Sequence, residues 1–430
     1  MDDELLDFQI ESRTDAIIKV IGVGGGGGNA VNHMFQEGIH DVSFALRNTD
    51  NQALMESPVP VKGQLGGHTT GGLGAGNKPE IAQKAAEESV DLIEDLLNDG
   101  TRMVFITAGM GGGTGTGAAP VVARVAKDMG VLTVGIVTIP FMFEGPRKIV
   151  QALKGVEEMA KNVDALLVIN NERLRDIYSD LTMLNAFAKA DDTLATAARS
   201  IAEIITVHGH VNLDFADVNT TLKDGGVAIM SSGLGKGEDR INVAIKNALH
   251  SPLLNNNDVF SAKKILINLS FGESHPLMME EMNALHDFMS KFSREIEVIW
   301  GAAVEESLDE EVKVTLLATG FSITSVPGIE EHEQEKTRAE QIQLQIEKDA
   351  KLAQEKKDKE LIEKYYGKTG LKTLTSINYR LEPFVLTIDE LDDDKVLEAL
   401  EKTPVFKREP DFNPRIFASD VQQQSSSLFD

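Results

Sequence analysis

Residues 109–117 read Gly-Met-Gly-Gly-Gly-Thr-Gly-Thr-Gly, and this stretch decides how the rest of the chain is interpreted. It follows an apolar run at residues 103–107 and opens a helical pattern at residues 115–129, so it connects a strand to a helix N-terminus. Glycines let the backbone approach a phosphate closely, and a helix N-terminus supplies N–H donors and a positive dipole. The stretch therefore predicts a polyphosphate-binding turn, to which two threonine hydroxyls add donors.

An earlier glycine run, Gly-Val-Gly-Gly-Gly-Gly-Gly-Asn at residues 22–29, also follows an apolar run and opens a helix, so it is the first of two runs, and residues 109–117 are the second. Taken alone, it fits a Rossmann turn as well, with Asp50 near the distance expected of a ribose-binding acid. An NAD-dependent oxidoreductase is therefore one alternative, although it leaves residues 109–117 unexplained. Two glycine runs at one sheet edge instead predict a single polyphosphate held between them.

The strand and helix patterns predict an α/β protein with a doubly wound parallel sheet. Apolar runs at residues 103–107, 132–139 and 165–169 are typical of strands buried on both faces. Helical patterns alternate with them, and ligands are expected at the carboxyl ends of such strands. The expected helices cover residues 79–97, 115–129, 148–162 and 184–207, with a loop at 208–214. A smaller α/β domain follows, with strands at 227–230, 265–269, 297–300 and 312–318 and helices at 239–250 and 278–292.

Composition excludes several classes of protein. The chain has 68 acidic and 42 basic residues, and a formal charge of −26 disfavours nucleic acid and anionic membranes while favouring divalent cations or basic partners. The absence of cysteine excludes disulfides and thiolate metal sites. The N-terminus is acidic, and the longest apolar run, residues 131–143, is interrupted by Gly135 and Pro140. We therefore expect a cytoplasmic protein that does not insert directly into a membrane.

The second glycine-rich turn matches the Gly-Gly-Gly-Thr-Gly-Thr/Ser-Gly signature of the tubulin family, and residues 16–321 resemble the FtsZ family, the bacterial relatives of tubulin. The resemblance implies a GTPase of the bacterial cell-division ring at mid-cell, self-assembling into head-to-tail homopolymers. Magnesium would lie on the phosphates of GTP, with no metal ligand directly assigned. A GTP-binding scaffold without efficient hydrolysis is an alternative. Eukaryotic-type tubulin is disfavoured because the second domain runs directly into a charged linker.

Five further stretches resemble nucleotide-binding loops of the family. The resemblance places Asp50 near the γ-phosphate and magnesium, and residues 71–80 in the loop that senses the γ-phosphate. It places Glu144 at the ribose and Asn171 at the ribose or base. Phe187 would stack on guanine and Asp191 would accept its N1 and 2-amino hydrogens. Lys148 stands where the family usually has arginine. A lysine keeps the positive charge but lacks the planar guanidinium group of arginine.

The expected GTP-binding residues are Gly25, Gly26, Gly27, Gly28, Asn29, Asp50, Gly74, Ala75, Gly76, Gly112, Gly113, Thr114, Gly115, Thr116, Gly117, Glu144, Lys148, Asn171, Phe187 and Asp191.

Residues 212–217, Asn-Leu-Asp-Phe-Ala-Asp, form the acid loop. They match the family's loop that enters the nucleotide pocket of the next subunit. The resemblance implies that Asn212, Asp214 and Asp217 are catalytic, with the two carboxylates polarising the attacking water. Read alone, Asp214 is well placed to cap the following helix. His208 and His210 just upstream suggest a metal pair only if further ligands exist, and the sequence offers no such cluster.

These patterns divide the chain into an N-terminal tail (1–15), a GTP-binding domain (16–183), a connecting helix with the acid loop (184–214), a second α/β domain (215–322), a charged linker (323–383) and a C-terminal tail (384–430). Residues 403–408 of the tail loosely resemble the family's docking peptide, which implies contacts with division proteins and membrane anchors. A disordered basic patch is the alternative.

Overall fold

The computed structural model describes residues 16–39, 41–178, 182–206, 209–211, 213–251, 259–293, 295–326 and 329, and, further on, residues 348, 356–361, 363, 364, 367, 397 and 401. The chain divides into two compact units, residues 1–335 and 336–430. The sheet and the helices around it lie in the first unit. In the second unit, residues 356–361 form the longest described helical run.

The described strands form one mixed sheet in the order β3-β2-β1-β4-β5-β6-β8-β11-β9-β10-β7. The six strands from β3 to β6 are parallel to their neighbours, as the doubly wound pattern predicted. Parallel pairs between β6 and β8 join the two halves of the sheet. The strands are β1 (Ile18–Val23), β2 (Val42–Asn48), β3 (Val61–Gln64), β4 (Met103–Gly109), β5 (Leu132–Ile139), β6 (Ala165–Asn170), β7 (Gly209–Val211), β8 (Gly226–Gly235), β9 (Lys264–Phe271), β10 (Glu297–Val304) and β11 (Val312–Phe321).

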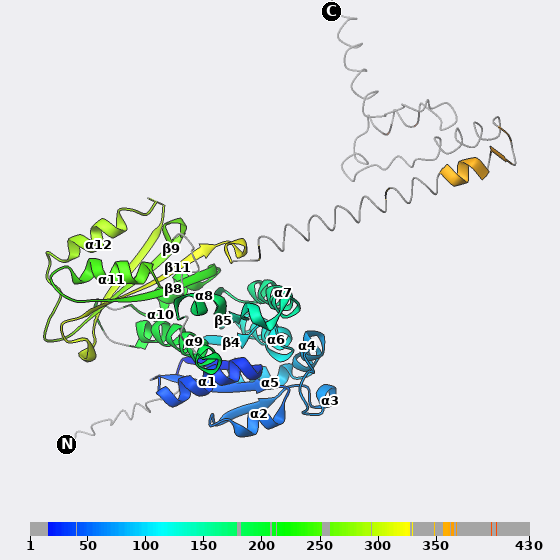
Figure 1. Cartoon of the computed structure of the whole chain (residues 1–430), viewed down its shortest axis with the longest axis horizontal. Helices are drawn as coiled ribbons and strands as arrows, with labels where there is room; N and C mark the ends of the chain where they lie inside the picture. The colour runs from blue at the N-terminus through cyan, green and yellow to red at the C-terminus, as the bar shows by residue number, and fades with distance from the viewer. Residues whose placement is uncertain are drawn as a thin grey trace, which may run out of the picture. The chain divides into compact units, whose positions relative to one another are not determined.

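Helices cover both faces of this sheet, so its strands are apolar on both sides (Figure 1). On one face pack α4 (Pro79–Glu87), α5 (Val90–Leu97), α6 (Thr114–Asp128), α7 (Pro146–Asn162), α11 (Arg240–Leu249) and α12 (Met282–Met289). On the other pack α1 (Gly24–Glu37), α2 (Asn51–Glu56), α8 (Asn171–Ile177), α9 (Met183–Thr206) and α10 (Phe215–Leu222). The short α3 (Gly67–Thr70) and the 3-10 turn η1 (Met142–Glu144) lie in connections.

The sheet changes winding direction at β1, which pairs with β2 on one side and with β4 on the other. Ligands of doubly wound sheets bind outside the carboxyl ends of the strands at such a point. Both glycine runs lie there, because one follows β1 and the other follows β4.

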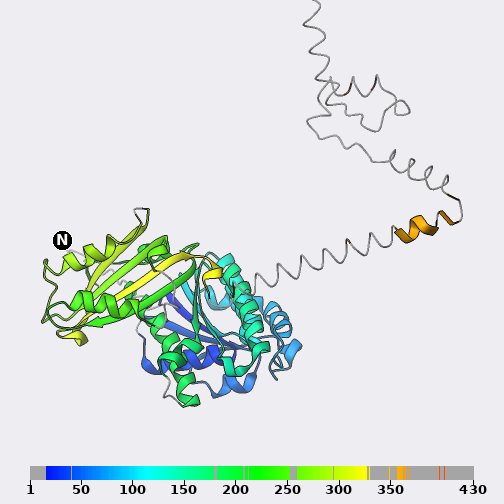
Figure 2. The same cartoon turned by 45° about the horizontal axis from the view of Figure 1, so that its top comes forward.

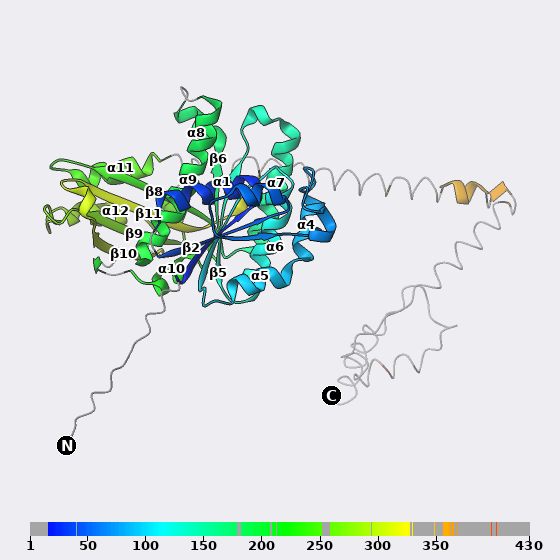
Figure 3. The same ribbon diagram turned by 90° about the horizontal axis from the view of Figure 1, so that it is seen from below.

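Helix α9 connects the earlier, blue-to-cyan half of the first unit to the later, green-to-yellow half (Figure 2). It lies beside α1 on the same face of the sheet (Figure 3). Among the residues that the structure describes, no helix is long and apolar enough to cross a membrane.

Three expected elements were wrong in detail. The helix expected at residues 278–292 is shorter, because residues 279–281 and 290–291 are turns and only α12 between them is helical. The helix expected at residues 79–97 is two helices, α4 and α5, interrupted at Glu88 and Ser89. The Glu88 carboxylate accepts the N–H groups of His68 and Thr69, and the Ser89 hydroxyl accepts the N–H of Gly66. Both side chains therefore stabilise the start of α3, and the helix is interrupted where they lie. The loop expected at residues 208–214 contains strand β7, which pairs with β10 at the sheet edge.

The packed core of the first unit also extends past residue 322, after which the sequence pattern predicted a linker. Val326 is 2% exposed and Ile329 is completely buried, and both belong to the core on the α6 face.

Candidate functional site

Some glycines of the two runs pack so closely that they leave little or no space for a side chain. A Cβ atom on Gly24 would lie 2.8 Å from the backbone nitrogen of Gly115, and one on Gly26 would lie 3.2 Å from Cα of Gly109. A Cβ on Gly27 would lie 2.2 Å from a carbonyl oxygen of β4. These glycines bring the first turns of α1 and α6 together, as the sequence predicted.

Other glycines of the same runs face open space. A Cβ on Gly25, Gly28 or Gly112 would meet no atom within 4 Å. Tight packing therefore does not account for these three, and the space in front of them is available to a ligand that approaches the backbone.

Both helices begin without a side-chain cap. Val23 precedes α1 and Gly113 precedes α6, and neither provides a side-chain acceptor for the first N–H groups. The first four N–H groups of a helix have no partner within the helix and carry its partial positive charge. Two such ends side by side can bind a polyphosphate in a chain whose net charge is strongly negative.

The two threonines of the second run differ in their surroundings. Thr114 Oγ1 lies 2.7 Å from Thr49 Oγ1, which connects α6 to the end of β2. Thr116 is 5% exposed, and its hydroxyl oxygen accepts the Gly111 N–H at 2.8 Å. The buried Thr116 side chain thus stabilises the turn at Gly111.

Gly117, like Thr116, faces a groove between α4, α6 and α7. A Cβ on Gly117 would lie 2.0 Å from the carbonyl oxygen of Pro79 in α4. The groove, of about 620 Å³, is lined by Thr116 and Gly117 but by none of the other expected GTP-binding residues. Thr116 and Gly117 therefore lie apart from the open glycines.

Residues 74–76 lie against the second glycine run. Gly74 donates its N–H to the carbonyl of Thr49 at 3.1 Å, and a Cβ on Gly113 would lie 3.1 Å from Cβ of Ala75. Asp50 caps α2 by accepting the Gln52 N–H through Oδ1 at 2.9 Å. These contacts bring Asp50 and the expected γ-phosphate loop to the same edge as the glycine runs.

Glu144 and Lys148 are paired with each other. The carboxylate of Glu144 accepts the Phe141 N–H at 2.9 Å through one oxygen and lies 2.5 Å from the Lys148 ammonium through the other. The lysine therefore orients the expected ribose-binding carboxylate in this structure. Nearby, Gln151 donates to the carbonyls of Gly111 and Gly112 at 3.0 and 3.1 Å, a brace that no sequence signal revealed.

Phe187 belongs to an aromatic group that the sequence did not predict. Its ring packs edge-on against Phe141, with centroids 5.1 Å apart, and against Phe143 at 6.4 Å. Phe141 is completely buried, whereas Phe187 keeps 37% of its surface exposed. The buried ring of Phe141 holds Phe187 in place, and the exposed part of the Phe187 ring is free to stack on a base.

Two polar residues, Asn171 and Asp191, are also expected at the ribose or base. Asn171 is 5% exposed, and its Oδ1 has no hydrogen-bond partner among the described residues. Burial raises the pKa of the Asp191 carboxyl to about 6, and the nearby charge of His33 opposes this rise. An ionised Asp191 in this partly buried position is a strong acceptor that a bound base with two donors would satisfy.

Asp214 and Asp217 form a reciprocal cap at the start of α10. Asp214 Oδ1 accepts the N–H groups of Ala216 and Asp217 at 2.7 and 3.1 Å, and Asp217 Oδ2 accepts the Asp214 N–H at 3.0 Å. The capping that the residues alone suggested is therefore present. Asn212 and His208, and the side chain of His210, lie outside the described residues.

The acid loop lies at the opposite end of the sheet from the glycine runs. The guanidinium of Arg102, which immediately precedes β4, lies 4.4 Å from the ring centroid of Phe215. The second glycine run follows the other end of β4, which at about 3.3 Å per residue is roughly 20 Å away. The structure thus places Asp50, Gly74, Ala75 and the open glycines at one edge of the sheet, with Asp214 and Asp217 at the other.

Comparison with known proteins gives consistent matches along the chain. Residues 17–179 match the GTPase domain of the Tubulin/FtsZ family, and residues 226–322 match the C-terminal domain of the FtsZ family. Cell division protein FtsZ of Porphyromonas gingivalis is 52% identical over 415 residues, which are 95% of this chain and 89% of that protein. FtsZ of Aquifex aeolicus is 46% identical over 71% of this chain and 83% of its own length. A solved FtsZ dimer from M. jannaschii superposes with a TM-score of 0.66 at 38% identity, covering 74% of this chain and 92% of that one.

Proposed function

This chain belongs to the FtsZ family of tubulin-like, filament-forming cell-division GTPases, and from this we propose that each of its catalytic sites is built by two successive subunits. The chain binds and hydrolyses GTP as a member of this family. One subunit provides the nucleotide pocket, and the acid loop of the next subunit completes it. Such a contact is heterologous, so its repetition produces a filament.

The proposed pocket uses the loops at the carboxyl ends of β1 to β6. The phosphates bind the uncapped N-termini of α1 and α6, in front of Gly25, Gly28 and Gly112. The base stacks on Phe187, and the Asp191 carboxylate accepts the two hydrogens that guanine presents and adenine does not.

Magnesium is proposed as the cofactor on the phosphates. Asp50 fits a role in holding it, because Oδ1 forms the cap of α2 and Oδ2 is not part of that cap. In phosphoryl transfer the metal neutralises charge that develops on the phosphate oxygens, and the protein mainly positions the groups.

The observation that carries the shared-site proposal is the separation of the acids from the pocket within one chain. Asp214 and Asp217 lie about one strand length away from the glycine runs, at the other end of β4. No side-chain rotation covers that distance, so these acids can act only on the nucleotide of another subunit. The cap holds both carboxylates at the start of α10, where they orient the attacking water.

The remaining partners and the location of the protein follow from the family. We expect it in the cytoplasm at the mid-cell division site, with division proteins and membrane anchors contacting the C-terminal tail. Residues 403–408 lie outside the described residues, and the role proposed for the tail rests on their resemblance alone.

The test separates catalysis from capping with two substitutions at one position. Asparagine caps a helix as well as aspartate does, so Asp214→Asn keeps the turn and removes the charge. We expect GTP affinity to stay within about twofold of the parent value, while turnover falls at least about a hundredfold, or roughly 3 kcal/mol of barrier. Nucleotide binding is measured by fluorescence titration and turnover by phosphate release. Full turnover in Asp214→Asn would mean that Asp214 is only a cap.

A further inference from the structure

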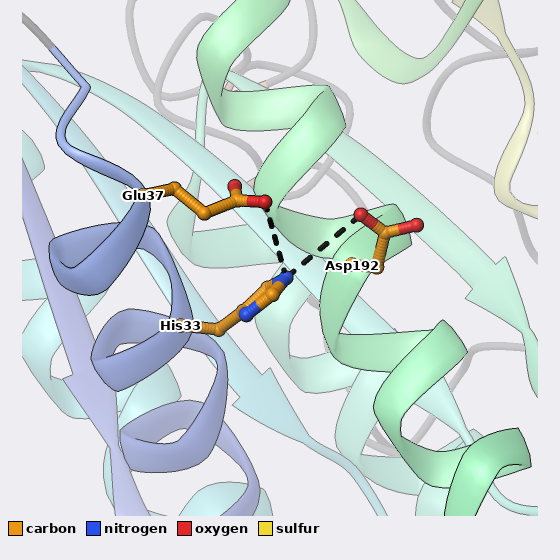
Figure 4. A group of neighbouring side chains, drawn as sticks. All are labelled: His33, Glu37 and Asp192. Atoms are coloured by element: carbon orange, nitrogen blue, oxygen red, sulfur yellow. Dashed lines mark ion pairs between the residues drawn. The ribbon is translucent and has the colours of Figure 1, made fainter.

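The ring nitrogen Nε2 of His33 is buried although the side chain of His33 is 36% exposed. It lies 3.4 Å from Oε1 of Glu37, one turn further along α1, and 3.8 Å from Oδ1 of Asp192 on α9 (Figure 4). It forms no hydrogen bond with either carboxylate or with any other residue that the structure describes. An unsatisfied nitrogen is therefore held between two anionic oxygens.

Each carboxylate is oriented by a cation on its other side. Arg199 pairs with Oε2 of Glu37, and Lys189 donates to Oδ2 of Asp192 at 2.6 Å. These pairs leave Oε1 and Oδ1, the two oxygens that face His33, available to a further ligand. In metal sites, a neighbouring residue regularly binds a ligand side chain through an atom that does not contact the metal, and this fixes the orientation of the ligand.

The spacing of the three atoms is close to what a small divalent cation needs. Ligand atoms that each lie about 2.1 Å from a tetrahedral zinc ion are about 3.4 Å apart. The three ligand atoms of this group lie within 4.8 Å of one another. Shifts of about 1 Å in these partly exposed side chains are enough to bring them to zinc distances.

We propose that His33, Glu37 and Asp192, the α1–α9 triad, bind a divalent transition-metal ion such as Zn²⁺. One imidazole and two carboxylates are a donor set that suits zinc, with water in the fourth position. The site is distinct from the magnesium position, which belongs to the phosphates.

Such an ion would connect the two helices that carry the nucleotide pocket. Helix α1 begins with the first glycine run, and α9 carries Phe187 and Asp191, the neighbour of the ligand Asp192. The metal would therefore alter nucleotide affinity, and the nucleotide would alter metal affinity by the same factor. This coupling rests on the proposed nucleotide site, whereas metal binding itself does not.

The test measures Zn²⁺ binding to the full-length, nucleotide-free protein by competition with a chromophoric chelator, in excess Mg²⁺. Because the chain has no cysteine, thiolates cannot contribute to the signal. Each of His33→Gln, Glu37→Gln and Asp192→Asn should weaken the tightest site at least about tenfold, and His33→Gln should abolish the visible absorption of tetrahedral Co²⁺. His286→Gln, at an exposed histidine on α12, is the matched control and should leave both signals unchanged.

Unchanged Zn²⁺ affinity in His33→Gln and Asp192→Asn would overturn the proposal, and the α1–α9 triad would then be a contact between two helices that holds no metal. Equal losses in His286→Gln would also overturn it, because they would indicate diffuse binding to an acidic surface. The triad lies at the surface and melting curves verify folding, so loss of structure cannot be mistaken for loss of the site. Zn²⁺ affinity measured with and without GDP tests the coupling separately.

Discussion

The two helices that follow the glycine runs differ from the helix that follows the acid loop in how their first turns are completed. At the nucleotide end, α1 and α6 start without a side-chain cap. At the other end, Asp214 and Asp217 cap α10 reciprocally. An uncapped start offers N–H donors to an anion, whereas a capped start has used its donors and presents carboxylates instead. The proposed phosphate site and the acid loop thus lie at opposite ends of the subunit.

The largest effect should follow from adding charge at the uncapped end. A Cβ atom on Gly112 would meet no protein atom within 4 Å, so we expect Gly112→Asp to fold normally and to place a carboxylate in the proposed phosphate site. Two unit charges about 4 Å apart repel by roughly 1–4 kcal/mol between bulk-water and near-surface conditions. We expect GTP affinity to fall about a hundredfold or more, measured by fluorescence titration.

The matched control is Gly112→Asn, which has nearly the same shape without the charge. It should bind GTP at least about tenfold more tightly than Gly112→Asp, because only the electrostatic part of the effect is removed. Equal affinities in the two variants would show that the phosphates do not lie in front of Gly112.

A smaller effect is expected at the base. Asp191→Ala removes the proposed partner of the guanine N1 and 2-amino groups, and a hydrogen bond to a charged group is worth about 1.5–3 kcal/mol. GTP affinity should fall about ten- to a hundredfold, whereas ATP affinity, measured in parallel, should change little. Selectivity that persists in Asp191→Ala would place the base elsewhere.

The smallest effect concerns stability at the capped end. Asp214→Ala removes the acceptor of two backbone N–H groups and should lower the free energy of unfolding by about 1 kcal/mol. Asp214→Asn keeps an acceptor and should lower it by only a few tenths. Urea unfolding of the two variants checks this. A stability loss as large in Asp214→Asn as in Asp214→Ala would show that the carboxylate charge, and not the cap, stabilises this turn.

Much of this arrangement could be predicted from the sequence, because local patterns carry it. The two glycine runs and the buried strands around them are contiguous signals, and the parallel half of the sheet follows from them. The capping role of Asp214 was likewise visible from its position before a helix.

The rest depends on contacts between distant residues. The break at Glu88 and Ser89 arises from hydrogen bonds to residues more than 18 positions earlier, and a helical stripe contains no trace of them. Strand β7 is three residues long and exists because β10 provides a partner. Gln151 reaches back 40 residues to the second glycine run. The α1–α9 triad joins residues 33 and 192, which only the folded chain brings together.

The most direct measurement of the central claim mixes two inactive proteins. Asp214→Asn retains a sound pocket but has a defective acid loop, and Gly112→Asp retains the acid loop but has a defective pocket. If each catalytic site is shared, a mixed contact pairs the sound pocket of one with the sound acid loop of the other, so phosphate release by the mixture should far exceed the sum of the separate rates. A mixture that stays at that sum, although both proteins fold and sediment together in filaments, would contradict the shared site.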